Sequence, residues 1–259
     1  MKATIDTFSN TAATKVHQLN HSKSKYLTMA MLAGFFVGLG IILIFTIGGL
    51  LAPENYAGTK IIMGVSFGIA LSLVIMAGSD LFTGNTMTMT IGTLTKKTTW
   101  IETLRIWLYS YVGNFAGSIL VAALFFYSGL ALGNTGDYIN EVASLKMNAP
   151  FMELLVRGIL CNILVCLAVW CSVKLKDETA KLIMIFWCLF AFITSGFEHS
   201  VANMTLLSIS MMIPHPETIS LAGMAANLIP VSIGNIIGGA IFIGAAYWYG
   251  ITNSNKKVI

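Results

Sequence analysis

Two short polar stretches interrupt long apolar runs of this chain, and the two stretches match each other. The first, residues 77–85, is AGSDLFTGN, and the second, residues 195–203, is SGFEHSVAN. A glycine, an acidic residue and an asparagine align in both, as Gly78 with Gly196, Asp80 with Glu198, and Asn85 with Asn203. A carboxylate at membrane depth costs roughly 2.5–3.5 kcal/mol on insertion scales, so a matched pair indicates a use. Polar, glycine-interrupted segments at corresponding places in two halves of a membrane protein are typical of a translocation site.

Composition is typical of a protein embedded in a bilayer. Of the 259 residues, 56% are hydrophobic and 10% are charged, whereas about a quarter of the residues of a soluble domain are charged. The formal net charge of +4 is spread over several loops, which excludes a basic surface of the size that nucleic acid requires. Six apolar spans reach the ~20 residues of a membrane helix, and they cover residues 27–51, 61–93, 102–130, 151–173, 180–213 and 221–249.

The second and fifth spans are longer than one straight crossing, and each contains one of the polar stretches. We therefore expect each of them to be a broken helix, because a loop at membrane depth is tolerated where protein or water satisfies its backbone. A Gly-Asn pair also repeats, at Gly113-Asn114 in the third span and Gly234-Asn235 in the sixth. With three spans per half, the two halves enter from opposite sides. The predicted fold is an all-α integral membrane protein, with six transmembrane helices in an inverted 3+3 repeat.

Basic residues predict the orientation of the chain. With the N-terminus inside, most lysines and arginines fall in cytoplasmic segments, the outer loops hold Lys60 and Lys146, and Arg157 falls at the start of the fourth span. This distribution follows the positive-inside rule, so both termini are expected on the cytoplasmic side of the cell inner membrane.

Three parts of the chain follow from these spans. Residues 1–25 predict an amphipathic cytoplasmic helix at the membrane surface, residues 26–250 the transmembrane domain, and residues 251–259 a cytoplasmic tail. The N-terminal helix is indicated by apolar residues at near-helical spacing, namely Ile5, Phe8, Ala12, Val16 and Leu19.

The polar stretches contain the residues that can carry chemistry. His199 lies inside a span, and an imidazole can exchange a proton with a weak acid near neutral pH; the alternative is a histidine that only bonds within the helix bundle. Thr83, in the other stretch, is expected to hydrogen-bond His199 between the two halves. Asp80 and Glu198 invite a proton relay, but capping of the N–H groups freed at a helix start is the favoured interpretation. Asn203 is grouped with them as a structural residue of the helix break.

Apolar and amide side chains complete the candidate site. Phe67 and Leu71 lie four residues apart and share a helix face, and Phe192 shortly precedes the second polar stretch. Apolar rings narrow a pore and make dehydration of an ion costly, although such residues more often pack or face lipid. Asn162 and Asn235 either line a path or pin the backbone of the broken helices.

These motifs resemble the formate/nitrite transporter family over nearly the whole chain. The resemblance rests on FGIALSL at 67–73, DLFTGN at 80–85, SGFEHSVANM at 195–204 and IPVSIGNIIGG at 229–239. The segments GLGIILIFTIG at 38–48 and LFTGNTM at 81–87 are most similar to the nitrite channel branch. The family implies an aquaporin-like protomer with its own pore, assembled as a homopentamer.

The resemblance also implies a role for individual positions. The matched residues are Phe67, Leu71 and Phe192 at the pore constrictions, Thr83 facing the central His199, Lys146 at the outer vestibule, and Asn162 and Asn235 beside the pore. A cation in a vestibule concentrates anions, while an apolar ring beyond it makes the charge of the anion expensive to keep. Protonation of the anion removes most of that cost.

The sequence therefore predicts a channel or transporter for nitrite or a similar small monovalent anion, with His199 able to protonate the substrate between two apolar constrictions. Formate and hydrosulfide are the alternatives within the family, and passive conduction and proton-coupled uptake both stay open. The expected partners are the anion, the lipid bilayer and further copies of the chain, with no cofactor, no metal and no nucleic acid.

Three other classes of protein are less consistent with the sequence. An aquaporin-type channel for neutral solutes uses paired Asn-Pro-Ala motifs, and neither polar stretch contains one. A membrane enzyme would need a nucleophile with its base, or converging metal ligands, and neither arrangement is indicated inside the spans. A scaffold protein would leave the polar residues within the spans unexplained.

Overall fold

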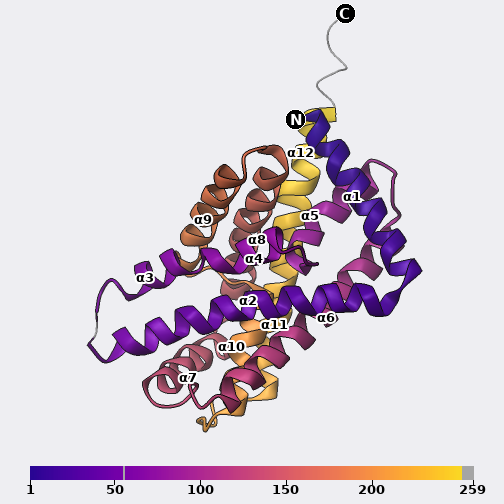
Figure 1. The fold of residues 1–259 in the computed structure, drawn as a ribbon. Coiled ribbons are helices and arrows are strands. Elements are labelled where there is room, and N and C mark those ends of the chain that lie inside the picture. Colours follow the sequence, from indigo (N-terminus) through magenta and orange to yellow (C-terminus); the bar gives the residue numbers. More distant parts are fainter. Residues whose placement is uncertain (55, 253–259) are drawn as a thin grey trace, which may run out of the picture.

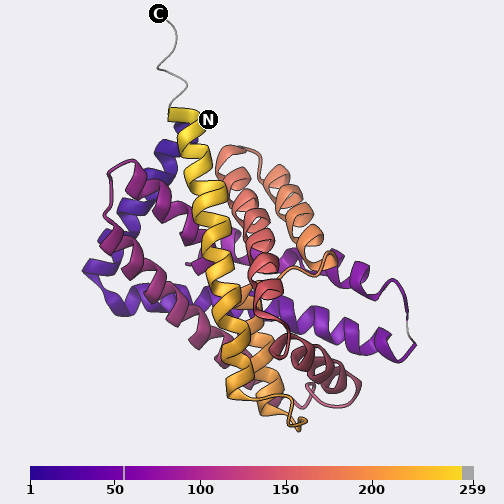
Figure 2. The same ribbon diagram turned by 180° about the vertical axis from the view of Figure 1, so that it is seen from behind.

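The computed structural model describes residues 1–54 and 56–252, which fold into helices joined by short connections (Figures 1 and 2). The predicted tail, residues 251–259, lies outside the described residues from position 253 onward. In chain order the elements are α1 (Lys2–His21), α2 (Lys23–Leu51), the 3-10 turn η1 (Ala52–Glu54), α3 (Thr59–Ser66), α4 (Gly68–Met76), α5 (Phe82–Leu94), α6 (Trp100–Tyr127), α7 (Asn134–Met147), α8 (Phe151–Lys174), α9 (Glu178–Thr194), α10 (Ser200–Met212), α11 (Leu221–Ile236), the π-helix η2 (Ile237–Ala245) and α12 (Ala246–Thr252).

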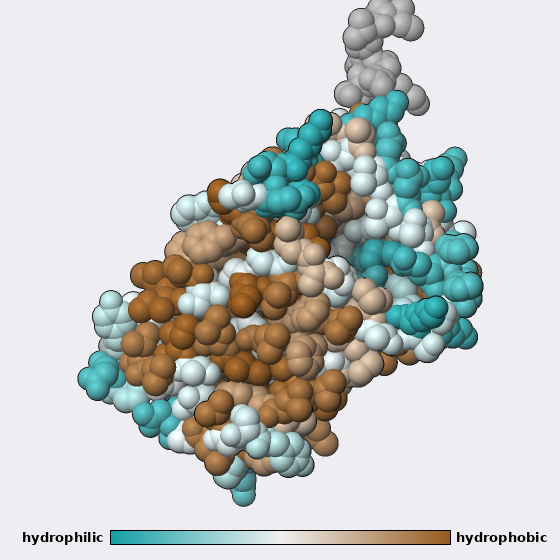
Figure 3. Space-filling model, viewed as in Figure 1, coloured by the Kyte–Doolittle hydropathy of each residue, from teal (hydrophilic) through white to brown (hydrophobic). Residues whose placement is uncertain are grey.

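Helices of the predicted apolar spans form the body of the molecule. Within residues 1–54 and 56–252, five helical segments are long and apolar enough to cross a membrane, and they are Lys23–Glu54, Thr59–Met76, Trp100–Tyr127, Phe151–Lys174 and Leu221–Thr252. The 17 residues of α9 and the shorter apolar helix α10 occupy the remaining predicted span, 180–213. Hydrophobic side chains cover the middle of the face in Figure 3, and hydrophilic ones gather toward the end that carries α1.

The chain leaves helical structure at residues 77–81 and 195–199, where the two polar stretches begin. Gly78 and Gly196 stand just after α4 and α9 with φ values of +77° and +75°. Glycine adopts this left-handed conformation without the steric cost that a side chain adds. The N–H group three residues beyond each helix end bonds back to a carbonyl of the last turn, from Ser79 to Val74 and from Phe197 to Phe192, both at 3.0 Å. This pattern ends a helix sharply and turns the chain into the loop that carries the acid.

Glycines let two pairs of helices touch backbone to backbone. A Cβ atom on Gly34 of α2 would lie 1.9 Å from the Asn114 carbonyl oxygen of α6, and one on Gly117 of α6 would lie 1.9 Å from the Met31 carbonyl oxygen. In the other half of the chain, a Cβ atom on Gly234 of α11 would lie 2.3 Å from the Leu155 carbonyl oxygen of α8. Small residues are used in this way at helix interfaces in membranes. The result is a rigid frame around the two loops.

The N-terminal helix is packed on protein. Its residues Ile5 and Phe8 are buried with Met87 and Trp170, and the Phe8 and Trp170 rings stack with centroids 5.4 Å apart. The apolar face of the amphipathic pattern is therefore covered by α5 and α8. Helices α1 and α7 lie at opposite ends of the bundle (Figures 1 and 2).

Candidate functional site

The acid of the first polar stretch is held by side chains from three other places in the chain. Asp80 Oδ1 accepts hydrogen bonds from the Tyr26 hydroxyl at 2.6 Å and from Asn85 Nδ2 at 2.5 Å. Asp80 Oδ2 pairs with the ammonium group of Lys15, which comes from α1. The carboxylate is thereby buried with its charge compensated, as a buried charge requires.

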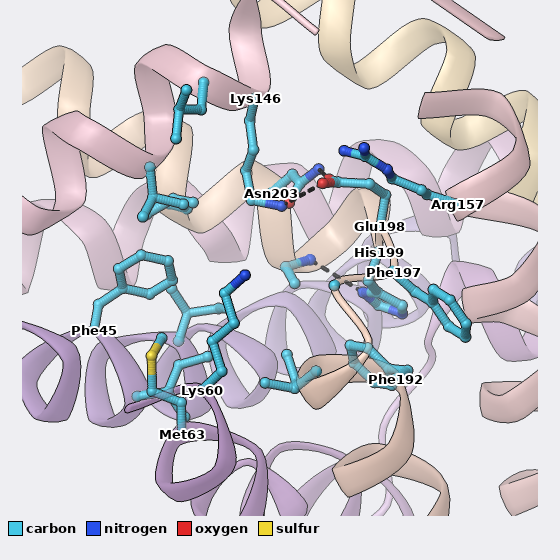
Figure 4. A pocket seen from close by; sticks show the side chains of 18 of the residues that line it. Phe45, Lys60, Met63, Lys146, Arg157, Phe192, Phe197, Glu198, His199 and Asn203 are labelled. Carbon is cyan, nitrogen blue, oxygen red and sulfur yellow. Dashed lines mark hydrogen bonds and ion pairs between the residues drawn. The ribbon is translucent and has the colours of Figure 1, made fainter. Parts of the chain in front are cut away.

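The acid of the second polar stretch is held in the same way. Glu198 Oε1 accepts a hydrogen bond from Lys146 Nζ at 2.7 Å, and Oε2 accepts one from Asn203 Nδ2 at 2.6 Å (Figure 4). Lys146 lies near the end of α7, so a surface helix again supplies the cation. Asn203 also donates to Asn227 Oδ1 at 2.8 Å. In each half, then, an acid bonds the asparagine five residues later and a lysine of a surface helix.

The backbone N–H groups at the starts of α5 and α10 are capped by residues other than those predicted. Asp80 and Glu198 take the side-chain partners just described, so the prediction that they cap backbone N–H groups is wrong. Instead, Asn114 Oδ1 accepts from Phe82 N at 2.8 Å, at the start of α5. Asn235 Oδ1 accepts from Ser200 N at 2.9 Å, at the start of α10. The reason is charge: each carboxylate has a lysine within reach, and a charge-assisted bond is stronger than a neutral one.

The amide nitrogens of Asn114 and Asn235 fix the loops to neighbouring helices. Asn114 Nδ2 donates to the Ala30 carbonyl at 2.7 Å and to the Asp80 carbonyl at 2.9 Å. Asn235 Nδ2 donates to the Gly158 carbonyl at 2.8 Å and to the Glu198 carbonyl at 3.0 Å. Both asparagines are fully buried, and Asn235 pins the backbone of the second loop.

His199 and Thr83 meet at the centre of the structure. His199 Nε2 lies 3.0 Å from Thr83 Oγ1, while His199 Nδ1 accepts from Ala202 N at 3.1 Å. Because Nδ1 is an acceptor, the neutral ring carries its hydrogen on Nε2 and donates it to Thr83. The Thr83 hydroxyl hydrogen is then left for another group, and no second partner of this hydroxyl is found among the described residues.

Apolar side chains close around His199. The Phe67 and Phe192 rings meet edge to face with centroids 5.5 Å apart, and the Phe192 and His199 rings stack at 6.0 Å. The sequence grouped Phe67 with Leu71, whereas the structure packs Phe67 directly on Phe192. Phe67, Leu71, Phe192 and His199 share the lining of a cavity of about 10 Å³, no more than a single water molecule needs. Leu81 and Val165 line it too, and sequence patterns gave no signal for them.

Asn162 lies behind this constriction. Its Nδ2 atom donates to the Thr83 carbonyl at 3.2 Å, to Thr86 Oγ1 at 2.9 Å and to the Asn235 carbonyl at 2.5 Å. The side chain has no exposed surface. The structure therefore brings Asn162 to the site as a support of the Thr83 backbone, outside the lining of the small cavity.

A pocket of about 270 Å³ opens above His199 at the end of the bundle that carries α7, and we call it the vestibule (Figure 4). Its polar lining includes Lys60, Lys146, Arg157, Glu198 and Asn203, and its floor includes Phe192 and His199; the remaining wall is largely apolar, with Ile41, Ile44, Phe45, Met63 and Val142. Lys146, which the resemblance assigned to an outer vestibule, is among the residues that line this pocket. Lys60 and Arg157 were not predicted, although Lys60 was already assigned to the same side of the chain.

A second pocket, of about 590 Å³, lies at the opposite end beside α1, and we call it the α1 pocket. Its lining includes Lys15, His21, Lys25, Tyr26 and Asp80. Each pocket is therefore bounded by one of the two buried acid–lysine pairs.

Loss of the Lys15 charge is expected to loosen α1. In a Lys15→Gln variant, Asp80 keeps Tyr26 and Asn85 but loses its cation, and removing one partner of a largely buried pair is destabilising. We expect backbone amides of α1 to exchange hydrogen at least about tenfold faster, with little change in α7. Lys2→Gln, an exposed lysine of the same helix, is the control. Equal protection of α1 in Lys15→Gln and the parent would show that the pair does not hold this helix.

The site holds a thiol, since Cys166 Sγ donates to the Thr83 carbonyl at 3.5 Å. Within residues 1–54 and 56–252, no three His, Cys, Asp or Glu side chains are placed to share a metal ion. Cys161, Cys166 and Cys188 are buried as free thiols. The polar atoms around His199 are instead hydrogen-bond donors and acceptors between two pockets.

Comparison with known proteins agrees with this arrangement. The family model of formate/nitrite transporters matches residues 2–249. The chain is 46% identical over 228 residues to the nitrite transporter NirC of Escherichia coli strain K12, covering 88% of this chain and 84% of NirC. Among solved structures, an FNT family ion channel matches with a TM-score of 0.92 and 41% identity over 96% of this chain and 99% of that one.

A second solved structure, a pentameric formate channel with formate bound, matches with a TM-score of 0.77 and 28% identity, over 87% of this chain and 96% of that one. These relatives are transporters and channels, which argues against the enzyme alternative. The resemblance that the motifs suggested is thus confirmed. The chain belongs to the formate/nitrite transporter family and is a multi-pass membrane transport protein.

Proposed function

We propose that the protein is a channel for nitrite, or a similar small monovalent anion, with His199 and Thr83 at its narrowest part. The observation that carries this proposal is the 3.0 Å contact between His199 Nε2 and Thr83 Oγ1, set in an apolar constriction below a cationic vestibule. The similarity to a nitrite transporter over most of the chain favours nitrite. Formate stays the alternative substrate, supported by the likeness to a formate channel, and hydrosulfide is a further candidate.

Dehydration is the main barrier along such a path. The vestibule offers cations to an arriving anion, but the Phe67–Phe192 ring pair beyond it offers only apolar surface. A bare charge in an apolar environment is very costly, whereas a neutral acid is not. We therefore assign part of the flux to the protonated form of the substrate.

The hydrogen-bond geometry defines how a proton would reach the anion. The ring must first gain a second proton at Nδ1, which displaces the bond from Ala202 N, a loss of about 1–3 kcal/mol for a buried donor. The attraction between imidazolium and anion offsets this loss. The Nε2 proton then passes to the Thr83 oxygen while the Thr83 hydroxyl proton passes to the anion, which leaves a neutral acid and a neutral ring with its hydrogen on Nδ1. The cycle closes when Nε2 takes up a proton and Nδ1 releases one, which restores the bond from Ala202 N.

The matching bonds around the two polar stretches support the finer architecture. We propose six transmembrane helices in an inverted 3+3 repeat with an aquaporin-like protomer, in which residues 77–81 and 195–199 interrupt the second and fifth helices. The support is the equivalence of Asp80 with Glu198, and of Asn114 with Asn235, in their hydrogen bonds.

The assembly and the orientation are part of the same proposal. A homopentamer is supported by the solved pentameric formate channel that this chain resembles. We further propose that both termini are cytoplasmic, in the cell inner membrane, with the α1 pocket inside and the vestibule outside. The clustering of lysines on the α1 side supports this orientation under the positive-inside rule; Lys15 and Lys25 line the α1 pocket.

Competition between anions is expected to identify the substrate. In proteoliposomes containing the purified protein, nitrite influx should exceed formate and hydrosulfide influx at equal concentration, and each should rise as the external pH falls from about 8 to about 5. The rise follows because more ions then cross as neutral acid. Liposomes without protein control for acid that crosses the lipid directly.

The outcomes separate the alternatives. Faster formate flux than nitrite flux would make formate the substrate, and glycerol-driven swelling without anion flux would favour a neutral-solute channel. If none of the three anions crosses faster than in empty liposomes, the proposed function is wrong.

A further inference from the structure

Three cations line the vestibule, and two of them are already paired. Lys146 Nζ lies 2.7 Å from Glu198 Oε1, and Arg157 lies 2.5 Å from Glu153 Oε2. The ammonium group of Lys60 has no ion pair or hydrogen bond with any residue that the structure describes. The charges of Lys146 and Arg157 are thus balanced by carboxylates, and Lys60 carries the unbalanced positive charge of the vestibule.

Lys60 reaches the vestibule from a different wall than the other two. It stands in the first turn of α3, whereas Lys146 belongs to α7 and Arg157 to α8. In Figure 4 its side chain rises from α3 into the pocket, and its ammonium group faces the space across which Lys146 and Glu198 lie. The side chain is exposed, so the ammonium group is free to bind an ion that arrives from solution.

The surroundings of Lys60 favour a small anion. The vestibule of about 270 Å³ has room for a triatomic or tetraatomic ion with several waters, since a water molecule takes about 30 Å³. Much of the wall is apolar, with Ile41, Phe45 and Met63 among its residues. Low-dielectric walls strengthen the field of a single charge in a cleft, so one unpaired lysine has a large effect here.

We propose that Lys60 is an anion-binding residue that captures the substrate in the vestibule before it meets Phe192 and His199. This inference rests on the proposed function and adds a site to it. Lys146 cannot easily take this role, because moving it to an anion leaves Glu198 as an uncompensated buried charge, which is costly. Lys60 gives up no partner when it binds.

The inference is tested by initial rates of nitrite influx into right-side-out vesicles, at external nitrite concentrations from far below to far above half-saturation. In Lys60→Gln we expect the half-saturating concentration to rise on the order of tenfold, with maximal flux within about twofold of the parent. Lys60→Glu should raise it further, and Lys60→Arg should restore it. Lys97→Gln, an exposed lysine of the α5–α6 connection, is the matched control on the other side.

Ionic strength gives a second readout. Raising the salt concentration screens an exposed charge, so it should weaken nitrite uptake by the parent and have much less effect on Lys60→Gln. If the parent transports nitrite and Lys60→Gln keeps the same half-saturation and salt dependence, Lys60 does not bind the anion and the proposed function is unaffected. A parent that transports no anion would instead contradict the proposed function itself.

Discussion

Replacing His199 with asparagine is expected to remove most of the acid-stimulated nitrite flux while leaving a folded protein. At pH 5–6 we expect nitrite flux through His199→Asn to fall by at least about tenfold, because a positioned proton donor typically contributes roughly 10²–10⁴-fold to a rate. At pH 8, where few substrate ions cross as the neutral acid, we expect less than about a twofold change. Stopped-flow measurements on proteoliposomes with an internal pH indicator report the flux in both pH ranges.

Asparagine is the informative substitution because it can keep the hydrogen bonds of the ring. Its side-chain oxygen can accept from Ala202 N, as His199 Nδ1 does, since asparagine is a favourable N-cap residue. Its NH₂ group can donate toward Thr83 Oγ1, as Nε2 does. It has no titratable proton, however, so His199→Asn separates proton transfer from support of the loop.

Two further variants control this experiment. Thr83→Val removes the hydroxyl through which the proton is proposed to pass, and it should reproduce the loss of the acid-stimulated component. His199→Leu removes both hydrogen bonds and should lower thermal stability, which His199→Asn should not. An unchanged pH profile in His199→Asn would mean that the ring supplies no proton, and that His199 acts only as a hydrogen-bond donor to Thr83.

Much of the supporting framework could be predicted from the sequence, because it is repeated there. Gly78 and Gly196 end a helix at equivalent places, with φ values of +77° and +75°. Asn114 and Asn235 bond the starts of α5 and α10 in the same way. A structural requirement that recurs in both halves produces a repeated motif, and a repeated motif can be recognised in a single sequence.

The residues proposed to carry the chemistry lie at positions where the two polar stretches differ. Aligning the two polar stretches pairs His199 with Leu81, and Thr83 with Val201. Thr83 and His199 thus come from different halves, neither has a polar counterpart in the other half, and the structure joins them at 3.0 Å. Departures from an internal repeat are thus a signal for functional residues that does not depend on related sequences.

Other parts of the site could not be predicted, since they depend on packing between distant segments. Nothing in the spacing of α1 or α7 shows that Lys15 reaches Asp80 or that Lys146 reaches Glu198. The prediction accordingly paired the carboxylates with nearby backbone N–H groups, because only partners that are close in the sequence can be inferred from it. Lys60 and Arg157 converge on the vestibule for the same reason, from helices whose relative placement is tertiary.

Replacing Asn235 with leucine is expected to have the largest effect on stability. Leucine has a similar size but no polar atoms, so the Ser200 N–H group and the Gly158 and Glu198 carbonyls lose their partner in a fully buried position. An unsatisfied buried backbone group costs roughly 1–3 kcal/mol. We expect a total loss of roughly 3 kcal/mol or more, which lowers the Tm of the detergent-solubilised protein by about 6–12 °C.

Three further variants show which interactions account for the loss of stability. Asn235→Asp keeps the acceptor for Ser200 N but places a carboxylate oxygen against two carbonyls at a fully buried position, so its Tm should fall at least as far as that of Asn235→Leu. Asn20→Leu, at an exposed position of α1, should leave Tm within about 2 °C. Asn114→Leu removes the equivalent bonds of the other half and should match Asn235→Leu in magnitude.

If Asn114→Leu and Asn235→Leu lower the Tm by the same amount, both variants are also expected to impair transport. The two asparagines hold the loops that carry Thr83 and His199, so loosening either loop should lengthen the same 3.0 Å contact and lower flux even in protein that stays folded. Near-attack geometry is sensitive to displacements of about 1 Å. A variant with parental Tm and parental flux at either position would show that the loop is held by the acid–lysine pair alone, and that the asparagine bonds are dispensable.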